Sequence, residues 1–304
     1  MRDFEYKAPA TIDEAVALLT ERGSEARVLA GGTDIIVQLR EGLRKAGLVV
    51  DVKKIPELMS LAWRDDGGLD IGAAVPCHVL YNDAKVINAY PSITDSAKII
   101  GGWQIQGRAS LGGNLCNSSP AADSIPALIV ENATCRIAGP GGERLVPVQE
   151  FCTAPGTNVL TEGEMLVSLA LPPSGESSGS RYMRFIPRNE MDIAVTGAGA
   201  WLRLGEGGET VEEARLALSA VAPTPVVAGE AETWLQGKPA TEESFAEAGD
   251  IARKAASPIS DMRGPADYRT HLVGVLVKRA LKGALGRARG GDRNPVIPSG
   301  INLC

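Results

Sequence analysis

The stretch Leu29-Ala30-Gly31-Gly32-Thr33-Asp34-Ile35 joins a short apolar run to a segment whose apolar residues recur at helical spacing. The run 27–30 predicts a strand, and the glycine pair predicts a turn. Ile35, Ile36 and Leu39 predict a helix, which Thr33 or Asp34 would cap. A strand, a glycine turn and a helix N-terminus together present free N–H groups to a phosphate.

A second glycine pair lies about eighty residues further on, in Ser110-Leu111-Gly112-Gly113-Asn114, and residues 119–123 (Ser-Pro-Ala-Ala-Asp) follow it. Glycine lets a backbone approach a ligand closely, and successive exposed N–H groups form an anion-binding nest. Neither G-x-G-x-x-G nor G-x-x-x-x-G-K-[ST] occurs in the sequence. The two pairs together therefore predict two loops that grip one extended, phosphate-containing ligand.

The composition is that of a globular protein with one large or two medium domains. The chain has 304 residues, of which 44% are hydrophobic and 22% charged, with a net charge of −6. That charge gives no electrostatic case for binding nucleic acid or an anionic membrane. No stretch approaches the roughly 20 apolar residues that span a bilayer, and the first residues show no signal-peptide core. We expect a cytoplasmic protein.

Cysteine and histidine are sparse. The five cysteines never occur in C-x-x-C spacing, which argues against zinc, an iron–sulfur cluster or a disulfide framework in this chain. The two histidines, His78 and His271, lie outside the glycine motifs. Because histidine is the commonest general base, its absence there suggests that a bound cofactor supplies the chemistry. We predict no catalytic residue and no metal ligand.

The ordered motifs resemble those of one known family. Residues 30–35 (Ala-Gly-Gly-Thr-Asp-Ile), 108–114 (Arg-Ala-Ser-Leu-Gly-Gly-Asn) with 121–123 (Ala-Ala-Asp), and 188–194 are similar to segments of the FAD-binding subunit of molybdenum hydroxylases. That family includes the medium subunit of carbon monoxide dehydrogenase and the flavin domain of xanthine dehydrogenase. The resemblance runs from about residue 3 to about residue 285.

The site expected from the motifs is a FAD site. The amides of Gly31 to Ile35 would hold the pyrophosphate, with the Asp34 carboxylate turned away from it. Gly112 and Gly113 would approach the ribityl–phosphate region, where Ser110 and Asn114 donate. Asp123 would accept from cofactor hydroxyls or cap the following helix. The resemblance adds Ile100 against the flavin, the backbone near Leu166, and Arg184 where relatives often have lysine; it also places Cys116 near the isoalloxazine. The full set is Leu29, Ala30, Gly31, Gly32, Thr33, Asp34, Ile35, Ile100, Ser110, Gly112, Gly113, Asn114, Asp123, Leu166 and Arg184.

The fold expected is α+β in two domains. Residues 1–175 would form the FAD-binding domain, with lobes at about 1–55 and 56–175, and the resemblance implies the vanillyl-alcohol oxidase type. A linker over 174–180 would lead to a smaller domain at 181–286. There, strands at 181–187, 194–204 and 213–221 would make a three-stranded antiparallel sheet, followed by helices near 228–236, 241–256 and 266–285. The tail 287–304 would be either disordered or laid against a partner.

The resemblance implies electron transfer. A large subunit would carry the molybdenum cofactor, a small subunit would carry two [2Fe–2S] clusters, and this chain's FAD would pass electrons to an acceptor in an (αβγ)₂ assembly. The acceptor is open among NAD, oxygen, a quinone and another redox protein. Two alternatives stay open: a self-contained FAD-dependent oxidase or dehydrogenase, and a binding module that has lost its cofactor.

Overall fold

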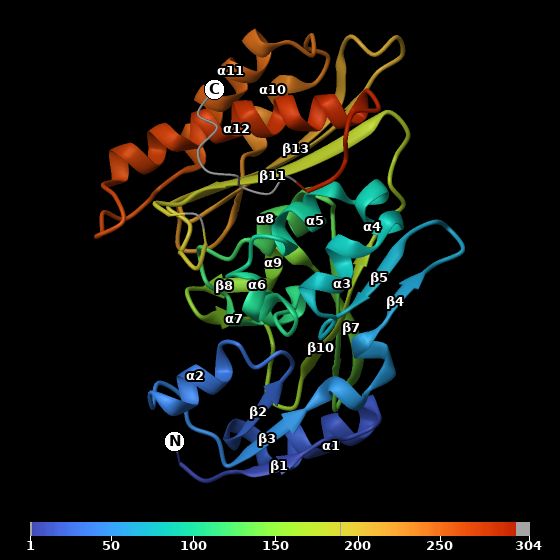
Figure 1. Ribbon diagram of the computed structural model, residues 1–304, viewed down its shortest axis with the longest axis vertical. Coiled ribbons are helices and arrows are strands. Elements are labelled where there is room, and N and C mark those ends of the chain that lie inside the picture. Colours follow the sequence, from blue (N-terminus) through green and yellow to red (C-terminus); the bar gives the residue numbers. More distant parts are fainter. Residues whose placement is uncertain (1, 189, 296–304) are drawn as a thin grey trace.

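The computed structural model describes residues 2–188 and 190–295 and shows a mixed α/β protein. Three parts follow one another along the long axis in Figure 1: an N-terminal lobe at the bottom, a middle part, and a C-terminal part on top. No helix within the described chain is long and apolar enough to cross a membrane.

The N-terminal lobe is a three-stranded parallel sheet with two helices. Its elements are β1 (Glu5–Lys7), α1 (Ile12–Arg22), β2 (Ala26–Leu29), α2 (Ile35–Arg40) and β3 (Leu48–Asp51), with strand order β1-β3-β2. Thr11 caps α1 as its sequence predicts, because its Oγ accepts from the Glu14 amide at 3.2 Å. Apolar residues of α1 and of the sheet, among them Ala15, Leu19 and Val50, form the core of this lobe.

Helix α2 differs from its prediction in two ways. It was expected to run to about Arg44, but it ends at Arg40, where Gly42 at φ +74° turns the chain. It was expected to be capped by Thr33 or Asp34. Asp34 occupies the N-cap position, yet its side chain makes no capping hydrogen bond. The Asp34 carboxylate therefore makes no bond to the first-turn amides of α2.

The middle part is built on a five-stranded antiparallel sheet in the order β4-β5-β10-β6-β7. Its strands are β4 (Leu61–Trp63), β5 (Leu69–Gly72), β6 (Thr134–Gly139), β7 (Gly142–Pro147) and β10 (Met165–Leu171). The sequence predicts two hairpins here, one with strands at 58–63 and 69–73 and one with strands at 133–138 and 143–148. The pairings of Leu61 with Ile71 and of Gly139 with Gly142 confirm both. The first strand starts later than expected because Pro56–Met59 forms a 3₁₀ turn.

Short helices cover this sheet on the side of the C-terminal part (Figure 1). They are α3 (Cys77–Asn82), α4 (Ala84–Ala89), α5 (Pro91–Ala97), α6 (Trp103–Gln106), α7 (Leu111–Asn117), α8 (Ser124–Val130) and α9 (Val148–Phe151). A small hairpin, β8 (Cys152–Ala154) with β9 (Thr157–Asn158), completes this part. Every residue of α5 and α8 is buried, because both helices lie between the middle and the C-terminal sheets.

The C-terminal part has four strands, not the three predicted. Its strands are β11 (Ser178–Phe185), β12 (Thr196–Leu204), β13 (Val211–Ser219) and β14 (Val226–Val227). The prediction missed β14, a two-residue strand in which Val226 pairs with Leu218. Helices α10 (Gly229–Leu235), α11 (Glu242–Ala252) and α12 (Ala266–Ala288) follow, and α12 packs on β11 and β12. The opposite face of the sheet packs on α5 and α8.

Two expectations at the ends of this part are wrong. Residues 178–180 do not belong to a linker, since β11 already begins at Ser178. The tail does not begin at Arg287 either, because α12 continues to Ala288 and the Arg287 side chain is buried. Arg293 then donates to the Asn88 and Ser178 carbonyls, so the chain up to Pro295 packs on its own fold. The rest of the predicted tail, 296–304, lies outside the described residues.

Candidate functional site: a cavity beside the N-terminal lobe

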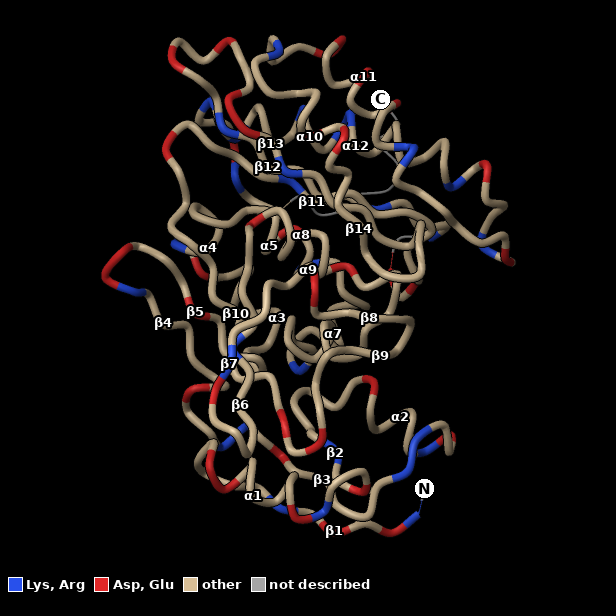
Figure 2. The backbone as a smooth tube through the Cα atoms, turned by 180° about the vertical axis from the view of Figure 1, so that it is seen from behind, with Lys and Arg blue, Asp and Glu red and all other residues tan. Residues whose placement is uncertain are grey.

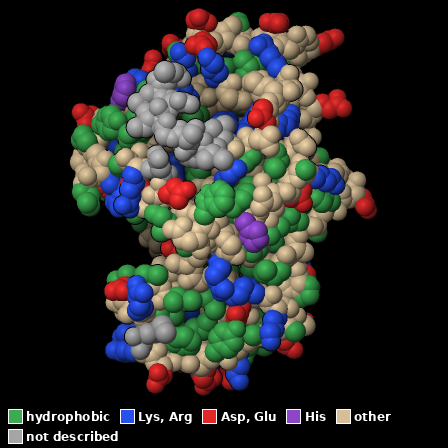
Figure 3. All heavy atoms as spheres, in the orientation of Figure 1, with side chains coloured by type: hydrophobic (Ala, Val, Ile, Leu, Met, Phe, Trp, Pro, Cys, Tyr) green, Lys and Arg blue, Asp and Glu red, His purple; other side chains and the backbone are tan. Residues whose placement is uncertain are grey.

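A cavity of about 580 Å³ lies where the N-terminal lobe meets the parts above it. Its walls come from the turn between β2 and α2, the segment around α6, helix α7, the turn 119–123, strand β10, and residues 191–193. At this level the molecule is hollowed on the left of Figure 3. The cavity brings together all of the predicted site residues except Leu29 and Arg184.

The backbone conformation and its close contacts require glycine at both positions of the first pair. A Cβ on Gly31 would lie 2.0 Å from the Arg108 carbonyl oxygen, so the two loops meet without room for a side chain. The Arg108 Nε donates to the Gly31 carbonyl at 2.9 Å and fixes this contact. Gly32 has φ +83°, which favours glycine. The turn that the sequence predicts is therefore confirmed.

This turn leaves a row of amides without partners in the protein. Within the described chain, the N–H groups of Gly32, Thr33 and Asp34 donate to no backbone carbonyl, and α2 has no side-chain cap to accept from them. These residues line the cavity. Because an unpaired polar group costs free energy, the row is suited to donate hydrogen bonds to the oxygens of an anionic ligand.

The second glycine pair lies in a helix and not in the loop that was predicted. Gly112 and Gly113 occupy the first turn of α7, which Ser110 caps by accepting from the Gly113 amide at 3.1 Å. A Cβ on Gly112 would lie 2.4 Å from the Ala73 carbonyl oxygen, so this glycine serves packing against the end of β5. A Cβ on Gly113 would meet only Ser110 Oγ, at 3.0 Å. Gly113 is thus the position where a ligand, and not the protein, sets the available space.

Asn114 and Ser110 keep donors available at the start of α7. The Asn114 Oδ1 accepts from the amide and the hydroxyl of Ser124 at 3.2 and 2.7 Å, which orients its NH₂ group as a donor. The Ser110 hydroxyl accepts from Gly113 and retains its own proton. The predicted donor role of both residues is compatible with these contacts.

Two side chains of the C-terminal part bind the Asp123 carboxylate. Its carboxylate accepts from Tyr182 Oη at 2.9 Å and from Arg184 Nη1 at 2.5 Å. It makes no capping bond to α8, so the capping alternative is wrong. Burial raises the pKa of Asp123, and the contacts with Arg184 and Tyr182 oppose that rise.

The two predicted residues outside the cavity support its walls. Arg184 is almost fully buried, and besides Asp123 it reaches the Ile99 carbonyl at 2.8 Å, next to the cavity residue Ile100. Leu29 points into the core of the N-terminal lobe beside Leu39 and Val49. Neither side chain is placed to touch a ligand.

The structure adds residues that the sequence analysis did not select. Arg27 and Arg44 line the cavity from the N-terminal lobe, and Met191, Asp192 and Ile193 line it from the loop between β11 and β12. The Met191 amide donates to the Gly101 carbonyl at 3.1 Å, which ties that loop to the segment before α6. The motif at 188–194 was the signal that could have identified this loop. No sequence signal identified the two arginines, because basic side chains outside the motifs were interpreted as solvated surface.

Cys116 lines the same cavity as a free thiol. Burial raises its pKa to about 12, so the thiol stays protonated at neutral pH. Among the described residues no group of three or more His, Cys, Asp or Glu side chains is arranged to hold a metal ion.

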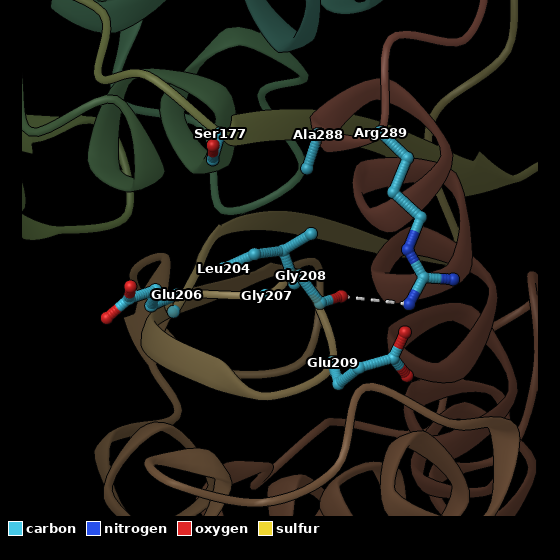
Figure 4. Close-up of a pocket in the computed structure, with 9 residues that line it drawn as sticks. Ser177, Leu204, Glu206, Gly207, Gly208, Glu209, Ala288 and Arg289 are labelled. Carbon is cyan, nitrogen blue, oxygen red and sulfur yellow. Dashed lines mark hydrogen bonds between the residues drawn. The ribbon is translucent and has the colours of Figure 1, made fainter.

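A second cavity, of about 480 Å³, lies between the β12–β13 turn and the end of α12 (Figure 4). Ser177, Ala288, Arg289 and residues 204–209 line it. Arg289 donates to the Gly208 carbonyl at 3.0 Å across it. It contains none of the predicted site residues, so the chemistry predicted from the glycine motifs belongs to the first cavity.

Comparison with known proteins identifies the family. Residues 2–174 match the FAD binding domain in molybdopterin dehydrogenase, and residues 181–284 match the CO dehydrogenase flavoprotein C-terminal domain. The xanthine dehydrogenase FAD-binding subunit of Escherichia coli O157:H7 is 33% identical over 95% of this chain and 99% of its own length. The carbon monoxide dehydrogenase medium chain of Hydrogenophaga pseudoflava is 33% identical over 93% of this chain and 98% of its own.

Solved structures agree with the sequence matches. A carbon monoxide dehydrogenase structure from Hydrogenophaga pseudoflava, which lacks the Mo-pyranopterin moiety of its molybdenum cofactor, superposes with a TM-score of 0.89 at 33% identity, covering 94% of this chain and 98% of that chain. This chain belongs to the family of FAD-binding subunits of molybdenum hydroxylases. The predicted family, FAD cofactor and oxidoreductase class are therefore confirmed.

The residues present fit FAD. The cavity volume lies within the roughly 300–1,000 Å³ of small-molecule sites. The unpaired amides at 32–34 suit a pyrophosphate, and Gly113 leaves space where a Cβ would otherwise stand. Apolar Ile100 and Leu166 line the cavity beside Ala109, as a planar ring system requires.

Proposed function

We propose that this chain holds FAD in the cavity beside the N-terminal lobe and passes electrons from a [2Fe–2S] partner subunit through it to an external acceptor. The observation that carries the proposal is the row of unpaired amides at 32–34, which lines the same cavity as Gly113. The N-terminal and middle parts would be a FAD-binding domain of the vanillyl-alcohol oxidase type, residues 1–175, and 181–286 a second domain, as the two family matches support.

Each wall has its own task in this proposal. The amides at 32–34 donate to the pyrophosphate oxygens, and the Asp34 side chain makes no capping bond to the start of α2. Ser110 and Asn114 donate to the ribityl–phosphate region from the start of α7. Ile100 and Leu166 pack against the isoalloxazine and exclude water from it.

Among the described residues that line the cavity there is no histidine, while Asp34, Glu164 and Asp192 line it besides Asp123. Neither His78 nor His271 lines it, and both oxygens of Asp123 are occupied by Tyr182 and Arg184. Bound FAD supplies the chemistry, because a flavin takes up and releases electrons singly or in pairs. The protein's contribution is to bind, orient and shield the cofactor.

Partners follow from the family. The related chains are subunits of larger dehydrogenases. We propose that this chain has two partners, a small subunit with two [2Fe–2S] clusters and a large subunit with the molybdenum cofactor. The three subunits would form an (αβγ)₂ assembly with a cytoplasmic location. Substrate would then bind to the large subunit.

The test separates electron transfer from self-contained catalysis. The purified FAD-loaded chain is mixed anaerobically with a reduced one-electron donor such as a [2Fe–2S] ferredoxin, and in parallel with purines, aldehydes and N-heterocycles. Bleaching of the flavin band by the ferredoxin alone is the expected result. Turnover of an organic donor by the isolated chain would favour the alternative, a self-contained oxidase or dehydrogenase.

A further inference from the structure

Two arginines lie together at the N-terminal-lobe end of the cavity. Arg27 comes from β2 and Arg44 from the turn after α2, and both line the cavity that holds the unpaired amides at 32–34. Figure 2 shows part of the chain that follows α2 coloured for Lys and Arg. Burial lowers the pKa of Arg27, and the positive charge of Arg44 lowers it further.

No carboxylate of the described chain relieves this repulsion. Neither guanidinium takes part in the ion pairs of the described residues, whereas the neighbouring Arg40 is paired with Glu41 at 3.0 Å. Arg27 is also held in one orientation, since its Nη1 donates to the Ser24 and Ala26 carbonyls at 2.6 and 2.7 Å. Its Nε is buried without a hydrogen-bond partner. Arg27 is held in place, and the exposed Arg44 lines the same cavity. Two cations that no described carboxylate neutralises can together bind an anion there.

The position of the pair selects which part of the ligand it meets. The apolar residues Ile100 and Leu166, with residues 191–193, line the cavity from the middle and C-terminal parts, and the arginines line it from the N-terminal lobe. The amides at 32–34 belong to the same lobe as the arginines. If the flavin ring lies against the apolar residues, the half of FAD beyond the pyrophosphate extends toward the arginines.

We propose that Arg27 and Arg44 together bind the phosphate charge on the adenylate side of FAD and so make the site selective for FAD over FMN. This inference rests on the proposed FAD site. FMN lacks the adenylate half and reaches only the amides, so it gains little from the arginine pair.

The test compares the affinities of the apoprotein for FAD, FMN and ADP, measured by flavin fluorescence quenching and by displacement of FAD. Arg27→Gln and Arg44→Gln should each weaken FAD and ADP binding about tenfold, the scale of one charge-assisted hydrogen bond. FMN affinity should change by less than about twofold on the same scale. Arg40→Gln is the matched control, since Arg40 lies on α2, is exposed and does not line the cavity.

Two further measurements guard against a merely structural effect. Arg27→Lys keeps the charge and should therefore retain most of the FAD affinity that Arg27→Gln loses. Raising the salt concentration should weaken FAD binding less in the double variant, Arg27→Gln with Arg44→Gln, than in the wild type. Equal losses for FAD and FMN, or unchanged FAD affinity in the double variant, would overturn the inference while leaving the FAD site in place. A wild-type chain that binds no FAD would overturn the proposed function as well.

Discussion

The Arg184 guanidinium contacts the Asp123 carboxylate at 2.5 Å, and this buried pair joins β11 of the C-terminal part to the cavity wall before α8. Tyr182, from the same strand, donates to the other carboxylate oxygen. The C-terminal part therefore fixes the cavity wall that Asp123 forms.

Replacing Arg184 by methionine tests how much this ion pair contributes to the free energy of unfolding. The variant leaves a buried carboxylate without its cation, which costs about 3–5 kcal/mol of unfolding free energy. Tyr182→Phe removes one hydrogen bond and should cost about 1 kcal/mol. Denaturant unfolding of the apoprotein measures both. A methionine variant as stable as the wild type would show that the contact does not hold the wall.

The two glycines of α7 should respond differently to the same substitution. Gly113→Ala adds a Cβ that meets only Ser110 Oγ, so the variant should fold but bind FAD more weakly by about tenfold or more. Gly112→Ala places a Cβ against the Ala73 backbone and should lower stability itself, by about 1–3 kcal/mol. Thermal melts and FAD titrations of both variants separate the effects. Full FAD affinity in Gly113→Ala would show that the ribityl–phosphate region does not lie at this position.

A second buried ion pair links the end of α12 to the middle part. Arg287 Nη1 and Nη2 reach the Asp95 carboxylate at 2.6 and 2.9 Å, and both side chains are almost inaccessible to solvent. Arg287→Met should destabilise the chain by about 3–5 kcal/mol. Arg289→Met, at an exposed position two residues on, is the control and should cost less than about 0.5 kcal/mol. Equal melting temperatures for the two variants would contradict this account.

The Cys116 thiol provides a pH test of the cavity. Because burial raises its pKa to about 12, the thiolate fraction at neutral pH is small and grows tenfold with each pH unit up to that pKa. The rate of alkylation at Cys116, followed by mass spectrometry of its peptide, should therefore rise without a plateau from about pH 7 to pH 10. Bound FAD should slow it at every pH. A plateau near pH 9 would mean that the thiol is open to water.

The sequence predicted the local features of the site and missed the contacts between distant segments. The turn at 31–32 was predictable because the backbone requires glycine at both positions. Gly32 has a positive φ, and Gly31 closely approaches another segment of the chain. The helical start at 112–113 was not, because glycine is a poor helix former and only packing against Ala73 accounts for it.

The support of the site was beyond sequence reasoning for a physical reason. Asp123 and Arg184 are far apart in the chain, and nothing in either segment marks the other as its partner. Arg184 was predicted as a cofactor contact from the resemblance, and the fold turns it toward Asp123 and the Ile99 carbonyl. Arg27 was not selected, because nothing in its own segment marks it as part of the cavity that it lines.

The most direct test of the account is the visible absorption spectrum of the purified chain after incubation with FAD and removal of the excess, compared with that of Gly113→Val. The account predicts an oxidised-flavin spectrum for the wild type, release of intact FAD on denaturation, and a colourless but folded Gly113→Val. A wild type that retains no flavin, or a variant that retains as much as the wild type, would contradict the claim that FAD binds in this cavity.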